Sequence, residues 1–139
     1  MRQFIVFLVV LAVAFFAIGE WRGVYLGILG QTPVVAYKTD HTAQSVRRTI
    51  NRDSLPVRLT GQVRHGDLKV TVDFERPVSF QTGAAALPNQ TVFERTYRTG
   101  ERVALNELVQ AGTGIYTVRL DFSEGSGMFT LRLPTGAEL

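Results

Sequence analysis

The chain has 139 residues, a formal net charge of +3 at pH 7 and no cysteine. The absence of cysteine excludes disulfides, thiolate metal sites and a cysteine nucleophile. A chain of this length can hold one domain of roughly 80 to 100 residues behind an N-terminal segment, and apolar packing alone must stabilise that domain.

An apolar run dominates the N-terminus. No charged or polar side chain occurs from Phe4 to Ile18. Such a run is typical of a membrane helix or an export signal, because exposing it to water is unfavourable. We expect residues 1–30 to form an uncleaved signal-anchor helix. The alternative is a signal peptide cleaved after Gly19, since Ala17 and Gly19 supply small residues at the cut.

The anchor hypothesis requires the helix to continue past this run, because fifteen residues span about 22 Å of a hydrocarbon core about 30 Å thick. Aromatic and basic side chains favour the membrane–water interface, and this predicts interfacial positions for Trp21, Arg22 and Tyr25. Glycine at every fourth position forms a smooth helical ridge for close packing against another helix. The glycines concerned are Gly19, Gly23 and Gly27. The alternative is that they only loosen a linker.

Residues 31–55 are predicted to form a connector with a short amphipathic helix. Thr42 can cap this helix, and Ala43, Val46 and Ile50 recur along one of its faces. Three arginines lie on its other faces, where they either contact an anion or a partner or form a solvated surface. They are Arg47, Arg48 and Arg52.

From residue 56 the apolar residues alternate with polar ones, which indicates half-buried β-strands. Two such runs flank His65-Gly66, and this dipeptide predicts a tight hairpin turn. In the resulting register Val63 faces Leu68, and Arg58 faces Asp73 on the opposite side of the sheet.

The remaining segments extend this pattern. The fold class that we expect for residues 56–134 is all-β, an antiparallel sandwich or small barrel of about seven strands. The expected elements are a short strand at 78–80, a loop at 83–89, strands at 91–97 and 102–105 around a Thr99-Gly100 turn, an irregular or helical turn at 106–114, and strands at 116–122 and 129–133 joined by 123–127. A frayed tail at 135–139 follows.

Candidate reactive groups are few. Two isolated histidines without cysteine make a poor metal site, and no glycine-rich nucleotide loop or nucleophile elbow is present. Asp73, Glu75 and Asp121 could line one face of the sheet as catalytic carboxylates, but ion pairing is the favoured interpretation. For Asp121 the expected neighbour is Thr130 or Arg132. In one register Arg119 opposes Arg132, and two opposed guanidinium groups would favour an anion between them.

These observations predict a membrane-anchored, extracytoplasmic β-sandwich that acts as a binding or structural subunit of a membrane or envelope complex. The expected location is the cytoplasmic membrane, with one membrane pass and a protein partner. The alternative is a secreted or periplasmic ligand-binding module released by cleavage near Gly19. We expect no catalytic residue, metal or cofactor. Nucleic-acid binding is not expected either, because basic residues are not interleaved with exposed aromatic residues.

Overall fold

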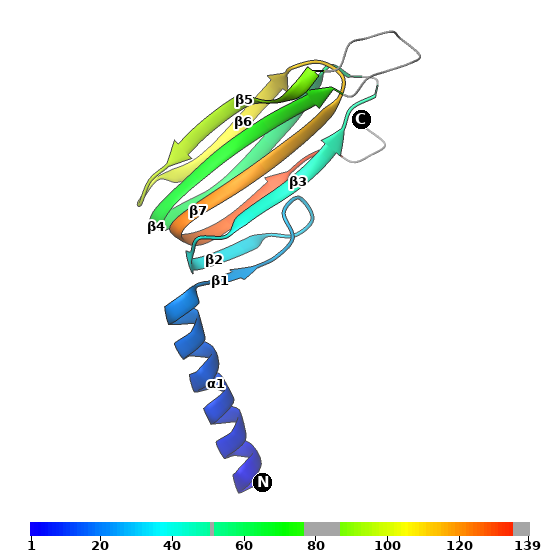
Figure 1. The fold of residues 1–139 in the computed structure, drawn as a ribbon. Helices are drawn as coiled ribbons and strands as arrows, with labels where there is room; N and C mark the ends of the chain where they lie inside the picture. The colour runs from blue at the N-terminus through cyan, green and yellow to red at the C-terminus, as the bar shows by residue number, and fades with distance from the viewer. Residues whose placement is uncertain (51, 77–86, 135–139) are drawn as a thin grey trace.

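The computed structural model describes residues 1–50, 52–76 and 87–134, and it joins one N-terminal helix to a β-sheet body. Helix α1 (Arg2–Arg22) projects away from the body (Figure 1). Seven strands occur in the described residues and every pairing between them is antiparallel, which confirms the predicted antiparallel, all-β class. Three of the seven strands precede residue 54, whereas all of the predicted strands lay within 56–134. They are β1 (Val24–Leu26), β2 (Val34–Thr39), β3 (Thr42–Arg48), β4 (Ser54–Arg76), β5 (Leu87–Tyr97), β6 (Arg102–Gln110) and β7 (Ile115–Arg132).

Helix α1 contains the whole apolar run from Phe4 to Ile18 and ends at Arg22. The predicted continuation to residue 30 is wrong, because Gly23 adopts a φ of +75°, outside the right-handed helical region, and the chain turns there into β1. Within the described part of the chain, no helix combines the length and apolar character needed to cross a membrane.

Two long strands, β4 and β7, form the centre of the sheet. They pair antiparallel from Arg58 opposite Arg132 to Glu75 opposite Ile115. The predicted tight hairpins at His65-Gly66 and at 123–127 are therefore wrong, since each strand continues through its glycine-containing segment. Pairing shifts between Val63 and Asp67, so these segments form a bulge rather than a reversal of the chain.

The bulge also changes which residues of β4 point inward. Before it the buried apolar side chains are odd-numbered, such as Leu59 and Val63, and after it they are even-numbered, such as Leu68 and Val70. Gly66 has a φ of +69°, and a Cβ atom there would collide with the carbonyl oxygens of Ser123 and Glu124. Glycine is thus required for close strand approach at this position.

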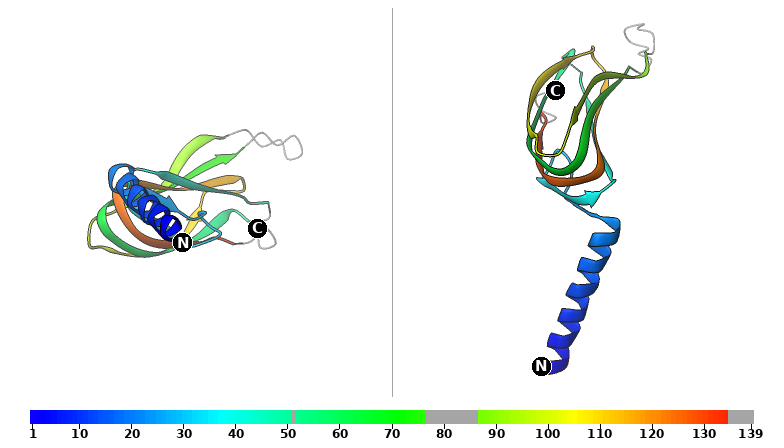
Figure 2. Two further views of the ribbon diagram at one scale, coloured as in Figure 1. Left: turned by 90° about the horizontal axis from the view of Figure 1, so that it is seen from below. Right: turned by 90° about the vertical axis from the view of Figure 1, so that its left-hand side faces the viewer.

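The bulge divides the sheet into two regions. The first half-sheet contains β6, residues 54–65 of β4, residues 126–132 of β7, and then β2 and β1. The second half-sheet contains β5, residues 67–76 of β4, residues 115–123 of β7, and β3. Figure 2 shows that the strands curve around an interior. Buried apolar side chains from both half-sheets fill this interior, with Phe74, Tyr116 and Phe129 the largest.

The segment predicted as a short helix is strand β3, which pairs with β7 from Thr42 opposite Asp121 to Arg48 opposite Ile115. Ala43 is buried whereas Val46 is exposed, so these two residues lie on opposite faces of a sheet rather than on one face of a helix. Pairing with β7 decides the structure here, because local helical periodicity is a weaker signal than a strand partner.

The Thr99-Gly100 turn is confirmed between β5 and β6. Strand β6 continues to Gln110, so the turn predicted from residue 106 is wrong over that stretch. Pairing with residues 54–62 of β4 extends β6 beyond the predicted end. The strand predicted at 78–80, most of the loop predicted at 83–89 and the tail at 135–139 lie outside the described residues.

Candidate functional site

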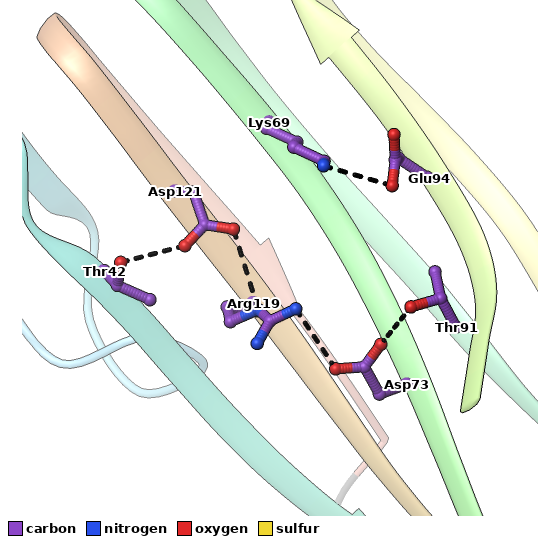
Figure 3. A network of polar contacts seen from close by, with 7 residues as sticks. All are labelled: Thr42, Lys69, Asp73, Thr91, Glu94, Arg119 and Asp121. Carbon is purple, nitrogen blue, oxygen red and sulfur yellow. Dashed lines mark hydrogen bonds and ion pairs between the residues drawn. The ribbon is translucent and has the colours of Figure 1, made fainter. Parts of the chain in front are cut away.

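The outer face of the second half-sheet carries a network of polar side chains (Figure 3). Arg119 of β7 lies between two carboxylates, with Nη2 3.3 Å from Asp73 Oδ2 and Nε 3.6 Å from Asp121 Oδ2. Asp73 belongs to β4, so this arginine joins the two central strands. The favoured interpretation of these acids as ion-paired therefore holds for Asp73 and Asp121.

Threonines on the flanking strands complete the hydrogen bonding of these carboxylates. The hydroxyl of Thr91 on β5 donates to Asp73 Oδ1 at 2.8 Å, and that of Thr42 on β3 donates to Asp121 Oδ1 at 2.8 Å. Lys69 and Glu94 form a further ion pair at 3.2 Å on the same face. The network consequently extends over four strands.

The partners differ from those expected. Asp73 does not face Arg58, and Asp121 faces neither Thr130 nor Arg132, because the hairpins that defined those registers do not form. Long-range pairing of β4 with β7 sets both partners. Glu75, the third candidate carboxylate, is exposed at the end of this pairing, opposite Ile115.

The network is only partly open to solvent. The Asp73 side chain is 8% exposed, whereas that of Arg119 is 38% exposed. Thr71 lies directly opposite Arg119 and is buried. The hydroxyl of Thr71 and Nε of Arg119 have no hydrogen-bond partner among the described residues. This arrangement fixes the orientation of Arg119 on a polar, partly exposed surface.

Among the described residues, no group of three or more histidine, aspartate or glutamate side chains is placed to hold a metal ion. His65 lies in the bulge of β4. The ring of His41 lies 4.3 Å from that of Tyr25, centroid to centroid. The two histidines are therefore in different surroundings.

The predicted interfacial residues are divided between the helix and the body. Trp21 and Arg22 belong to the last turn of α1. Tyr25 belongs to β1, where its ring is half-buried and lies 6.0 Å from Phe122. Burial raises the pKa of the Tyr25 hydroxyl above its usual value. Tyr25 thus packs against the body and does not extend the apolar surface of α1.

The predicted glycine ridge is not a helical surface. Gly19 belongs to α1, but Gly23 and Gly27 follow its end and have φ values of +75° and +115°. Added Cβ atoms would collide with the backbone of Lys38 at Gly23 and of Pro33 at Gly27. Both glycines serve turns beside β2, so the ridge hypothesis is corrected.

The predicted anion-contacting arginines do not form one cluster. Arg47 and Arg48 lie on β3, where Arg47 donates to the carbonyl of Val46, and Arg52 precedes β4. Arg119 belongs to the polar network. Arg132 faces Arg58 across β7 and β4, rather than facing Arg119. Arg58 was not among the predicted anion-contacting arginines, because only the long-range register identifies its partner.

Comparisons with known proteins provide little further information. No family model matches the chain, and no curated protein matches it. Three similar solved structures are of CENP-C from Drosophila melanogaster, two of its cupin domain and one of CENP-C bound to CAL1. Each is 10% identical, and the matches cover 81% of this chain and 72–76% of those chains. The TM-scores are 0.25 to 0.26.

Proposed function

We propose that this protein is a membrane-anchored β-sandwich whose body lies outside the cytoplasmic membrane and acts as a binding or structural subunit. The single observation that carries the proposal is the apolar surface of α1. Every side chain from Phe4 to Ile18 is apolar and exposed. Helix α1 also projects away from the body, which therefore does not cover that surface.

The apolar surface surrounds the helix. Successive helical residues point about 100° apart, so four in a row sample all sides of the helix. Phe4, Ile5, Val6 and Phe7 are 65, 57, 60 and 60% exposed. Leaving such side chains in water instead of burying them costs about 1.5–3 kcal/mol each. A helix that is apolar on all sides belongs in lipid or within a protein core, because docking on a protein surface leaves one side wet.

Lipid is the environment that we propose for α1. The apolar run spans about 22 Å, less than a hydrocarbon core of about 30 Å, and local thinning of the bilayer accommodates such a mismatch. Trp21 and Arg22 follow the run, and both residue types are favourable at the interface.

A role in binding is supported by the composition of the body. The two half-sheets enclose one apolar core, and the carboxylates of Asp73 and Asp121 are held by ion pairs and threonine hydrogen bonds. An arrangement of this kind presents fixed donors and acceptors to a partner.

Alkaline carbonate extraction of native membranes tests the anchor. We expect the full chain to remain in the pellet, and a Leu8→Arg, Leu11→Arg double variant to be released, because charges at the centre of a membrane helix are unfavourable. Leu108→Arg is the matched control, since Leu108 is exposed on β6 of the body.

The intact mass of the membrane-bound protein tests the alternative. A mass that includes residues 1–19 supports an anchor. A soluble protein whose mass matches a chain that starts at residue 20 would overturn the anchor hypothesis and support a secreted module instead.

A further inference from the structure

We infer that the outer face of the first half-sheet contains an oxyanion-binding site built on Arg58 and Arg132. This inference concerns the body alone, so it does not depend on membrane anchoring. The two arginines are direct cross-strand partners, Arg58 on β4 and Arg132 on β7. Side chains in such a pair project from Cβ atoms about 4.5–5.5 Å apart on one face of the sheet.

The pair also lines one cleft. This cleft has a volume of about 280 Å³, and its walls include Pro56, Arg58, Arg132, Leu133 and Pro134. No carboxylate of the described residues lines it. Both arginines are exposed, and neither forms an ion pair with a carboxylate in the described part of the chain. Within residues 1–50, 52–76 and 87–134, the site therefore holds two positive charges without a counter-charge.

The charged residues on the outer face of the second half-sheet are arranged differently from the Arg58–Arg132 pair. There Arg119 lies against two carboxylates, and Lys69 lies against Glu94. At Arg58 the third strand contributes Asn106, a neutral side chain, as the cross-strand neighbour on β6. The row across the first half-sheet thus reads arginine, arginine, asparagine, and it contains only hydrogen-bond donors and one amide oxygen.

An oxyanion is the ligand that fits these features. Like charges directly opposite each other destabilise a sheet, and a bound anion removes this repulsion. Guanidinium groups donate parallel hydrogen bonds to the oxygens of a phosphate or carboxylate. Proline and leucine beside the arginines provide contacts for an apolar part of the same ligand. The ligand class is therefore a phosphate or carboxylate carried on a partly apolar molecule.

Thermal unfolding of the full chain in an uncharged detergent tests the site, with inorganic phosphate, acetate and chloride compared at the same ionic strength. We expect phosphate or acetate to raise the Tm by a few degrees more than chloride, because an anion that binds only the folded state stabilises it. The more effective anion identifies the oxyanion class. Equal increases in Tm with all three salts would indicate that the salts only screen the repulsion between the arginines, and this result would overturn the inference.

The variant Arg132→Gln tests the site in a second way, because it should change the Tm and the phosphate affinity in opposite directions. At low ionic strength without phosphate it should raise the Tm by about 1–5 °C, because it removes the repulsion between the arginines. It should also weaken phosphate binding, measured by titration calorimetry, by about tenfold or more. Arg48→Gln is the matched control, since Arg48 is an exposed strand arginine on β3, and it should leave phosphate binding unchanged. Equal losses in both variants would contradict a site at Arg132.

Discussion

Asp73 and Arg119, which are 46 residues apart in the sequence, meet across β4 and β7 with 3.3 Å between the carboxylate and the guanidinium group. The aspartate side chain is almost fully buried, and the arginine is partly exposed. This asymmetry matters, because a buried charge that loses its partner is far more costly than an exposed one.

Arg119→Met should therefore destabilise the body. We expect the free energy of unfolding to fall by about 1–3 kcal/mol, less than for a fully buried pair because Arg119 is partly solvated. Lys69→Met breaks the exposed Lys69–Glu94 pair and should cost less than about 1 kcal/mol. Denaturant titration of both variants measures the difference. Equal costs would show that burial of Asp73 has no energetic consequence.

Two buried tyrosines should respond in opposite ways to loss of the hydroxyl group. The Tyr116 hydroxyl accepts from the Ala111 N–H and lies 3.0 Å from the Asp53 carbonyl oxygen, so Tyr116→Phe should cost about 1–2 kcal/mol. The Tyr97 hydroxyl is buried without a hydrogen-bond partner in the described residues, so Tyr97→Phe should be neutral or stabilising. Chemical denaturation compares the two, and a larger loss for Tyr97→Phe would contradict this assignment.

We expect the body to lose stability at alkaline pH, because these two tyrosines and Tyr25 have raised pKa values. Burial raises the pKa values of Tyr25, Tyr97 and Tyr116 above the ordinary value of 10.0. Above pH 10 the unfolded chain loses these protons before the folded chain does, so the folded state binds more protons and the free energy of unfolding falls as pH rises.

Unfolding measurements between pH 9 and 11 test this prediction. Tyr116→Phe should make the decline with pH shallower, because it removes one of the three groups. A decline as steep as that of the wild type would show that Tyr116 does not contribute.

Two glycines with positive φ should differ in how well they tolerate alanine. Gly66 at the bulge has the carbonyl oxygens of Ser123 and Glu124 where a Cβ would lie, whereas Gly100 has no atom within 4 Å of that point. Gly100→Ala should cost about 1–2 kcal/mol from backbone strain alone. Gly66→Ala should cost more than about 2 kcal/mol, since strand separation adds to the strain. Comparable unfolding midpoints would argue against close packing at the bulge.

Local signals in the sequence predicted part of this fold. Alternation identified the inward residues of β4 and β7, and the Thr99-Gly100 turn was located. His65-Gly66 was misinterpreted, because a glycine with positive φ serves a bulge between long strands as well as a two-residue turn. That error also changed the partner of Asp73, and the hairpin wrongly expected at 123–127 changed the partner of Arg132, since strand pairing decides which side chains meet. The spacing of Gly19, Gly23 and Gly27 at every fourth residue gave no indication that the helix ends at Arg22.

Site-directed thiol labelling tests the central proposal most directly, because the chain has no native cysteine. Thr99→Cys places one thiol on an exposed turn of the body, and Gln3→Cys places one near the start of α1. In intact cells, a membrane-impermeant maleimide should label Thr99→Cys at once and Gln3→Cys only after lysis. Labelling of Thr99→Cys only after lysis would place the body inside the cell and contradict the proposal.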